Sequence, residues 1–234
     1  MAIRKAAFAR TRAALLALAL WAGGIGPAAL ASGEDAVALP APSRDGTVPV
    51  ERALAQRRSL RKFAPDPLPL ASVSQLLWAA QGITHASGLR TAPSAGALYP
   101  LEVYLVVGAV SGLAPGVYRY DPGGHLLVPG AKGDLRAGVA AGALDQAWIA
   151  DAPAILVIGA VYQRTVRKYG ERATRYVHME VGHAAQNVYL QATALGLGTT
   201  MVGAYRDEQI ARLLELPERV DPLGLLPVGR RRSP

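Results

Sequence analysis

The stretch KYGERATRYVHMEVGHAAQNVYLQATALGLGT, residues 168–199, contains the longest helical pattern of the chain. Between residues 172 and 195 the apolar side chains recur at steps of three and four, the spacing of one helix face. Further apolar residues cover much of the remaining circumference, so we expect a central helix that is largely buried and also contacts a partner subunit. Gly196 stands where helices commonly end.

Shorter patterns on both sides of this helix predict further helices and strands. Helices are expected over residues 50–54, 71–81, 135–143 and 207–214, the last capped by Asp207. Strands are expected over residues 102–107, 117–120, 125–128, 154–161, 199–202 and 223–228. Strands separated by helices indicate an α+β or α/β sandwich.

The net charge of +8 among 234 residues does not indicate a nucleic-acid partner, because half of it lies in one amino-terminal segment. Residues 1–31 hold four basic residues and no acidic one, followed by a short apolar run and Ala29-Leu30-Ala31. These are the three parts of a secretory signal peptide, so we expect an exported, periplasmic protein. The alternative is an uncleaved anchor, which would be the chain's only contact with a membrane.

The domain organisation follows from this segment. We expect a signal peptide over residues 1–31, a linker rich in Ala, Pro, Gly and Ser over residues 32–48, and one folded domain over residues 49–234. The chain has no cysteine, which excludes disulfides and thiolate chemistry.

Arginines and a hydroxyl gather at the end of the first expected helix, at Arg57, Arg58, Ser59 and Arg61. Guanidinium groups there suit a phosphate monoester, and a solvated basic face is an equal alternative. Two loops of small residues, 93–96 and 196–199, would let the backbone approach a flat ligand, or they are only connections.

Lys168 and Tyr169 form a candidate proton-transfer pair, because the charge of a lysine can hold and activate a phenol. A cation packed on a ring at a helix entrance is the structural alternative. His178 and His183 are five residues apart and project from different helix faces, so we expect no metal site. Phosphate-loop, HExxH and GxSxG motifs are absent from the sequence.

Together and in this order, four segments resemble the FMN-dependent nitroreductase superfamily, most closely its SagB/ThcOx-like branch of azoline dehydrogenases. They are RRSLRKF at residue 57, PSAGALYPLEVYLV at residue 93, the stretch at residues 168–199, and LLPVGR at residue 225. The resemblance covers residues 50–230 and implies a three-layer α+β sandwich with a central mixed sheet, a long core helix and a homodimer.

The resemblance also implies FMN at the subunit interface and assigns roles to residues. Lys168 and Tyr169 would be catalytic. The implied FMN contacts are Arg57, Arg58, Ser59, Arg61, Pro93, Ser94, Ala95, Gly96, Gln186, Asn187, Gly196, Leu197, Gly198, Thr199 and Arg230.

The implied function is an FMN-dependent oxidoreductase that transfers hydride between a donor and a small or heterocyclic organic substrate. NAD(P)H is a candidate donor. The alternative is a flavin-binding dimeric protein of the same fold without efficient turnover.

Overall fold

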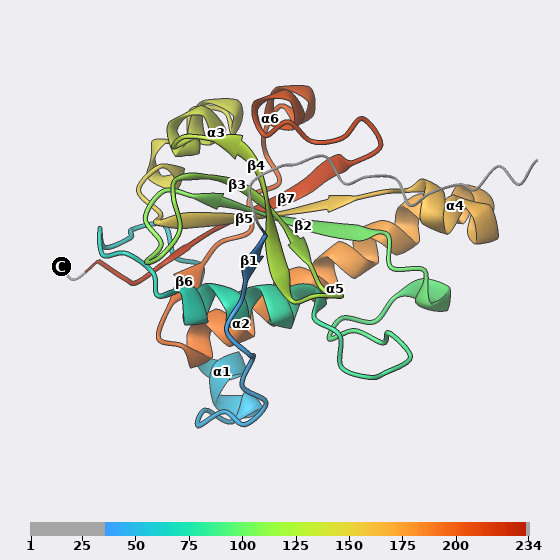
Figure 1. The fold of residues 1–234 in the computed structure, drawn as a ribbon, viewed down its shortest axis with the longest axis horizontal. Coiled ribbons are helices and arrows are strands. Elements are labelled where there is room, and N and C mark those ends of the chain that lie inside the picture. The colour runs from blue at the N-terminus through green and yellow to red at the C-terminus, as the bar shows by residue number, and fades with distance from the viewer. Residues whose placement is uncertain (1–35, 233–234) are drawn as a thin grey trace, which may run out of the picture. The chain divides into compact units, whose positions relative to one another are not determined.

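Seven strands form one sheet in the part of the chain that the computed structural model describes, residues 36–232 (Figure 1). The expected signal peptide, residues 1–31, lies outside that part. The order across the sheet is β1-β4-β3-β2-β5-β7-β6. The strands are β1 Val37–Ala38, β2 Leu101–Val107, β3 Gly116–Asp121, β4 Leu126–Lys132, β5 Ala154–Ala160, β6 Gly198–Thr199 and β7 Asp221–Gly229.

All pairings between these strands are antiparallel, so the sheet is not the mixed one that the resemblance implied. Parallel neighbours need a crossover connection between adjacent strands. Of the strands joined through helices, β4 and β5 are not neighbours in the sheet, and neither are β5 and β6. The strands β6 and β7 are neighbours, and they pair antiparallel. Within residues 36–232, parallel pairing occurs only at the isolated bridges Ser59–Thr199 and Leu68–Val110.

Helices cover both faces of the sheet, which confirms the expected layered α+β fold (Figure 1). The helices are α1 Val50–Gln56, α2 Leu70–Gln81, α3 Arg136–Gly142, α4 Gln163–Tyr169, α5 Ala173–Ala194 and α6 Asp207–Leu213. Figure 1 shows α3 and α6 on one face and α1, α2 and α5 on the other.

The central strand β5 shows why two layers of helices are needed. All seven of its residues are buried. Leu156 and Ile158 belong to the core cluster that includes α2 and α5, whereas Ile155 and Val157 belong to the cluster that includes α3 and α6. Because successive side chains of a strand point to opposite faces, a continuous apolar strand requires cover on both sides.

Helix α5 confirms the prediction of a long central helix. The turn at its carboxyl-terminal end directs the chain into β6. After the last helical residue, Gly196 takes a positive φ of 69°. Gly196 N–H donates to the Thr193 carbonyl at 3.1 Å and Leu197 N–H to the Ala192 carbonyl at 2.8 Å. This pair of hydrogen bonds is a Schellman motif, which fixes the direction of the following residues.

Four local expectations differ from the structure. Val37 and Ala38, inside the expected linker, pair with Leu127 and Leu126 of β4, so folded structure begins before Pro49. Two residues are too few to show a strand pattern. Helix α4 was not expected, because its sequence QRTVRKY has no apolar face.

At the start of α6, the capping residue is Arg206, and no side chain caps the helix. The expected cap, Asp207, is instead the first helical residue, where its charge suits the helix dipole. The strand expected over residues 199–202 is shortened to β6, and Val202 makes only an isolated bridge to Leu225.

Among residues 36–232, none of the helices combines the length and the apolar character that a membrane span requires.

Candidate functional site

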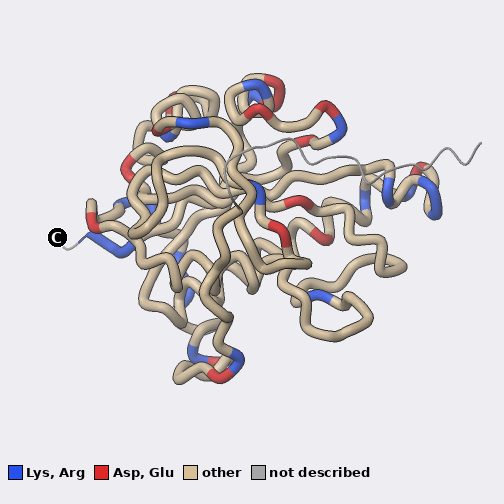
Figure 2. Tube along the Cα trace, viewed as in Figure 1, with Lys and Arg blue, Asp and Glu red and all other residues tan. Residues whose placement is uncertain are grey.

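Three of the segments singled out in the sequence meet at one end of the sheet. The segment at residues 59–64 lies between β6 and the residues that follow β7. Leu60 N–H donates to the Thr199 carbonyl at 3.0 Å, and the Thr200 hydroxyl donates to the Leu60 carbonyl at 2.8 Å. On the other side, Ala64 N–H donates to the Arg230 carbonyl at 2.9 Å. Figure 2 shows Lys and Arg residues grouped beside this described carboxyl-terminal end.

A cavity of about 210 Å³ opens beside the turn that ends α5. Among residues 36–232, its lining holds two guanidinium groups and no carboxylate. The lining residues are Gln56, Arg58, Leu60, Thr193, Gly196, Leu197, Gly198 and Arg231. The Arg58 guanidinium donates to the Ala55 and Arg57 carbonyls at 2.9 and 2.7 Å, which fixes its direction. Such a donor set fits a small anion such as a phosphate monoester.

The other arginines of the predicted phosphate site do not line this cavity. The Arg57 guanidinium lies 5.2 Å from the centroid of the Tyr189 ring, and that of Arg61 lies 5.8 Å from the Trp148 ring. Arg230 is exposed and contributes its carbonyl to the sheet edge, whereas the next residue, Arg231, reaches the cavity. Ser59 takes part through its backbone bridge to Thr199.

The loop at residues 93–96 meets the end of helix α4. A Cβ atom placed on Gly96 would lie 2.8 Å from the Tyr169 hydroxyl and 2.9 Å from the Lys168 Nζ. Two features that the sequence presented separately, the small-residue loop and the Lys–Tyr pair, therefore share one point in space.

The backbone of this loop is strained. Gly96, Ala97 and Tyr99 all have positive φ, at 64°, 54° and 46°. Alanine and tyrosine rarely adopt this region, and such residues persist only where the surroundings hold them. Strain of this kind gathers at functional sites.

Glu180 of α5 holds the loop in place. Its side chain is buried, at 4% exposure, and its Oε1 accepts a hydrogen bond from Ala95 N–H at 2.9 Å. It is also hydrogen-bonded to the side chain of Ser94, whose oxygen accepts from Tyr99 N–H at 2.9 Å. Burial raises the pKa of the Glu180 carboxyl, and these hydrogen bonds and the nearby His183 offset part of that effect.

The sequence did not assign this role to Glu180. The available signal was a carboxylate on the buried stripe of a helix, because a buried polar group there must have a partner. The partner could not be named from the sequence, since it lies 85 residues away.

Lys168 and Tyr169 lie together at the end of α4. The Lys168 Nζ lies 5.5 Å from the centroid of the Tyr169 ring. The ring of Tyr169 is held edge-to-face by Tyr176, with centroids 5.0 Å apart. Lys168 is exposed and Tyr169 half-buried, so the ammonium group can reach a ligand beside Gly96.

Two candidates on α5 take different positions. The Asn187 amide donates to the Ala79 and Thr91 carbonyls at 3.1 and 3.2 Å, which ties α5 to α2 and to the start of the loop. Its neighbour Gln186 is half-buried and takes no part in these hydrogen bonds. Asn187 therefore supports the site through packing.

The Nε2 atom of His178 lies 2.6 Å from the hydroxyl of Tyr162, so the histidine is hydrogen-bonded to the residue that precedes α4. Within the described range, no three His, Cys, Asp or Glu side chains lie close enough to share a metal ion.

The pKa of Glu180 gives a pH-dependent prediction. Because the folded state holds this proton more tightly than the unfolded chain, the carboxyl's contribution to stability is full below pH 4.5 and falls as the pH rises through the folded-state pKa. Gln keeps the acceptor oxygen but does not titrate. We therefore expect the free energy of unfolding of Glu180→Gln, relative to wild type, to be higher at pH 8 than at pH 5 in urea titrations.

Glu180→Ala serves as the comparison for this variant. It leaves the Ala95 N–H without an acceptor and should lose about 1–3 kcal/mol relative to wild type at pH 5 and less at pH 8, because alanine does not titrate either. A free energy of unfolding of Glu180→Gln that falls relative to wild type between pH 5 and pH 8 contradicts the assignment.

Gly96→Ala and Gly88→Ala form a matched pair in the same loop. Both glycines have positive φ, 64° and 84°, so each alanine should cost about 1–2 kcal/mol in unfolding free energy. Only the Cβ at residue 96 meets other atoms, and these are the flexible ends of Lys168 and Tyr169. We therefore expect similar losses of stability but a shift of the Tyr169 ring signals in the NMR spectrum of Gly96→Ala alone. Unchanged Tyr169 signals in that variant would place the loop elsewhere.

Comparison with known proteins agrees with this fold. Residues 54–230 match the Nitroreductase family. The archaeal protein MJ1384 of Methanocaldococcus jannaschii, whose name also carries the word nitroreductase, is 50% identical over 184 residues, 79% of this chain and 92% of MJ1384. A crystal structure of a nitroreductase-like protein from Ralstonia eutropha JMP134 matches with a TM-score of 0.75 and 32% identity, covering 85% of this chain and 90% of that one.

A third relative supports the SagB-like branch. The microcin B17-processing protein McbC of Escherichia coli is 30% identical over 142 residues, 57% of this chain and 52% of McbC. A chain in the structure of the E. coli McbBCD complex matches with a TM-score of 0.66 and 25% identity, over 86% of this chain and 80% of that one. Together these matches support an oxidoreductase of the flavin type, and the chain belongs to the nitroreductase family, in its SagB-like branch.

Proposed function

We propose that this chain is an FMN-dependent oxidoreductase that transfers hydride between a donor and a small or heterocyclic organic substrate. The observation that carries the proposal is the contact of the small-residue loop with Lys168 and Tyr169 at Gly96. A flat ligand against this loop would have a lysine and a phenol beside it. Membership of the nitroreductase family supports the redox class of the reaction.

The arginine-lined cavity supports FMN as the cofactor. Arg58 and Arg231 would hold the phosphate beside the turn at Gly196–Gly198. Gly198 is required for close packing, because a Cβ there would lie 2.6 Å from the Leu60 side chain. When bound, FMN supplies the group that accepts and returns hydride.

The protein's own residues have three tasks in this proposal. Glu180 orients the loop through Ala95 and Ser94. Lys168 places a positive charge beside the Tyr169 phenol, which would hold or move a proton on the substrate while hydride is transferred. The lining of small residues keeps side chains out of the space where a flat ring would lie.

The proposed substrate class and electron donor rest on the similarity of this chain to known proteins. The resemblance to azoline dehydrogenases favours a heterocyclic substrate, and McbC is named for the processing of a peptide, microcin B17. The chain spans about half the length of McbC, so a peptide substrate does not transfer to it directly. NAD(P)H is the proposed electron donor.

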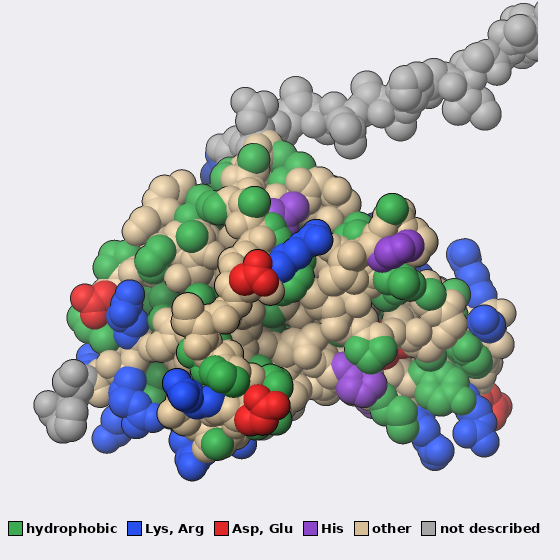
Figure 3. All heavy atoms as spheres, turned by 90° about the horizontal axis from the view of Figure 1, so that it is seen from below, with side chains coloured by type: hydrophobic (Ala, Val, Ile, Leu, Met, Phe, Trp, Pro, Cys, Tyr) green, Lys and Arg blue, Asp and Glu red, His purple; other side chains and the backbone are tan. Residues whose placement is uncertain are grey.

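A homodimer is part of the proposal. Val50 and Leu54 of α1 and Met179 of α5 are each more than half exposed, although all three are apolar. Figure 3 shows hydrophobic side chains on this face of the molecule and a hollow between two raised parts. A second copy would bury these side chains, and sedimentation equilibrium should then give twice the chain mass. Export through the segment at residues 1–31 is likewise a proposal, based on the sequence alone.

One observation favours a flavin-binding protein without efficient turnover. Lys168 lies over the Tyr169 ring, and Tyr169 packs against Tyr176, which is also what a purely structural cation–ring contact looks like. The two functions differ in whether the bound flavin is reduced and reoxidised repeatedly.

The phosphate site is tested by comparing two arginines that the sequence proposed together. Arg58→Ala should weaken FMN binding roughly tenfold to hundredfold, because it removes charge-assisted hydrogen bonds worth about 1.5–3 kcal/mol. Arg61→Ala should have a much smaller effect, since Arg61 lies on Trp148. Fluorescence titration of FMN measures both, and equal effects would show that the cavity is not the phosphate site.

Catalysis is tested by Lys168→Gln against Arg167→Gln, its exposed neighbour in α4. Loss of a proton-transfer group should lower kcat by about a hundredfold or more, whereas loss of a nearby surface charge should change it little. The assay is anaerobic reduction by NADH or NADPH, followed by reoxidation with quinones or nitroaromatics. A wild-type protein that binds FMN but does not turn over supports the alternative.

A further inference from the structure

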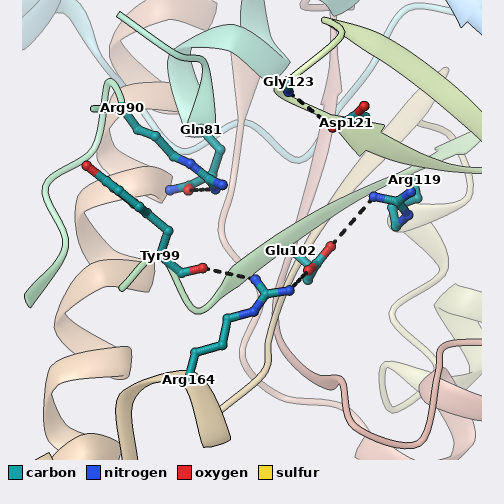
Figure 4. A network of polar contacts seen from close by, with 8 residues as sticks. All are labelled: Gln81, Arg90, Tyr99, Glu102, Arg119, Asp121, Gly123 and Arg164. Carbon is teal, nitrogen blue, oxygen red and sulfur yellow. Dashed lines mark hydrogen bonds and ion pairs between the residues drawn. The ribbon is translucent and has the colours of Figure 1, made fainter. Parts of the chain in front are cut away.

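A second cavity, of about 420 Å³, lies at the amino-terminal end of α4 and holds an uneven set of charges. Three arginines line it: Arg90 from the loop before β2, Arg119 from β3 and Arg164 from α4. The carboxylates in the lining are Glu102 of β2 and Asp121 of β3. Figure 4 shows these side chains around the cavity.

The Glu102 carboxylate neutralises the charge of one of these arginines and part of the charge of a second. It forms an ion pair with Arg164, whose other amino group donates to the Tyr99 carbonyl at 3.0 Å. Arg119 lies at 4.0 Å from the second Glu102 oxygen. Asp121 accepts a hydrogen bond from Gly123 N–H at 3.1 Å, and Figure 4 shows it across the cavity from Arg90.

Neither Glu102 nor Asp121 forms an ion pair with the third arginine, Arg90. In the part of the chain that the structure describes, no carboxylate oxygen lies within 4.0 Å of its guanidinium. One N–H donates to the Gln81 amide oxygen at 2.8 Å, and the group stacks on Tyr99 at 4.7 Å from the ring centroid. A guanidinium has five N–H donors, so donors remain for a ligand. Burial and the nearby charge of Arg164 lower the pKa of Arg90, as expected for a cation that lacks a counter-ion.

We propose that this cavity binds the carboxylate of a small organic acid, held by Arg90 beside Tyr99 and Arg164. The planar fork of a guanidinium matches a carboxylate with two parallel hydrogen bonds. A doubly charged phosphate fits less well, because Glu102 and Asp121 would repel it more strongly. Ile83, Leu98, Leu101 and Val103 also line the cavity and would contact the body attached to the carboxylate.

The position of the cavity links it to the candidate flavin site. Arg164 and Lys168 are four residues apart on α4, so they project from the same helix face about 6 Å apart along the axis. Tyr99, which lines the cavity, is tied to Ser94 of the loop that Glu180 holds.

The carboxylate could belong to the substrate, an assignment that rests on the proposed function, or to a separate acid that acts on the loop. The binding site itself does not depend on that function.

The location of binding is tested on the full ¹⁵N-labelled chain with bound FMN, titrated with sodium hexanoate. We expect NMR shifts at the Arg90 Nε, the Tyr99 amide and the Gly123 amide, and none of comparable size with the neutral hexanamide. Shifts confined to residues 93–97 and 196–200, or equal responses to hexanamide, would overturn the proposal. Tighter binding of inorganic phosphate than of hexanoate at these residues would overturn the choice of a carboxylate.

Variants test the role of Arg90. Arg90→Gln should weaken hexanoate binding at least about tenfold, and Arg90→Lys, which keeps the charge without the fork, should also weaken it. Arg212→Gln, on the exposed face of α6, is the control and should bind as wild type does. An unchanged affinity of Arg90→Gln for hexanoate would overturn the assignment. If that variant does not fold, the NMR titration of the wild-type chain still tests the proposal.

Turnover assays separate the two sources of the carboxylate. If it belongs to the substrate, Arg90→Gln raises KM for carboxylate-bearing substrates and not for neutral ones. If it belongs to a separate acid, hexanoate changes the turnover of a neutral substrate, and Arg90→Gln abolishes that change. Hexanoate binding without any FMN-dependent turnover would refute the proposed function alone, whereas turnover without hexanoate binding would refute this inference alone.

Discussion

The arrangement of the candidate site depends on one buried carboxylate. Glu180 gives up contact with water on α5 and regains hydrogen bonds from Ala95 and Ser94. An unpaired carboxylate in this position would be costly, so the contact is strongly favoured once the helix is packed. It forces the loop to pass close to α5 and brings Gly96 against Lys168 and Tyr169. The strained backbone at Ala97 and Tyr99 is tolerated because this contact holds the loop.

The carboxyl-terminal end of α5 positions the second half of the site. The Schellman motif at Gly196 turns the chain into β6, where Leu60 pairs with Thr199. That pairing places Arg58 beside the turn and Arg231 beside both. A single helix therefore positions the loop with its middle and the arginine-lined cavity with its end. Glu180 and Ala194 are fourteen residues apart on α5, about 21 Å along the helix axis. In the proposed homodimer, one FMN would meet both features where the loop of one copy lies beside the cavity of a second copy.

Much of this fold could be predicted from the sequence, because apolar periodicity reports burial. The spacing from Val177 to Ala192 predicted α5, and the continuous run at residues 154–161 predicted β5. Pairing direction and short elements were not predicted, since β1 and α4 carry too few apolar residues to show a period. For the candidate site, the sequence identified the segments but not the side chains that line the cavity. Whether Arg57, Arg61 or Arg231 faces the cavity depends on neighbours that are distant in sequence, such as Tyr189 and Trp148. Glu180 and Arg90 were missed for the same reason, because their roles come from contacts that only the folded chain creates.

The most direct test of this account is a crystal structure of the chain with FMN. The account predicts a homodimer with the phosphate between Arg58 and Arg231 of one copy and the ring along residues 93–96 of the second copy, within reach of Lys168 and Tyr169 of that second copy. It also predicts that Glu180 remains hydrogen-bonded to Ala95. A flavin bound elsewhere on the chain, or a phosphate held away from both arginines, would contradict it.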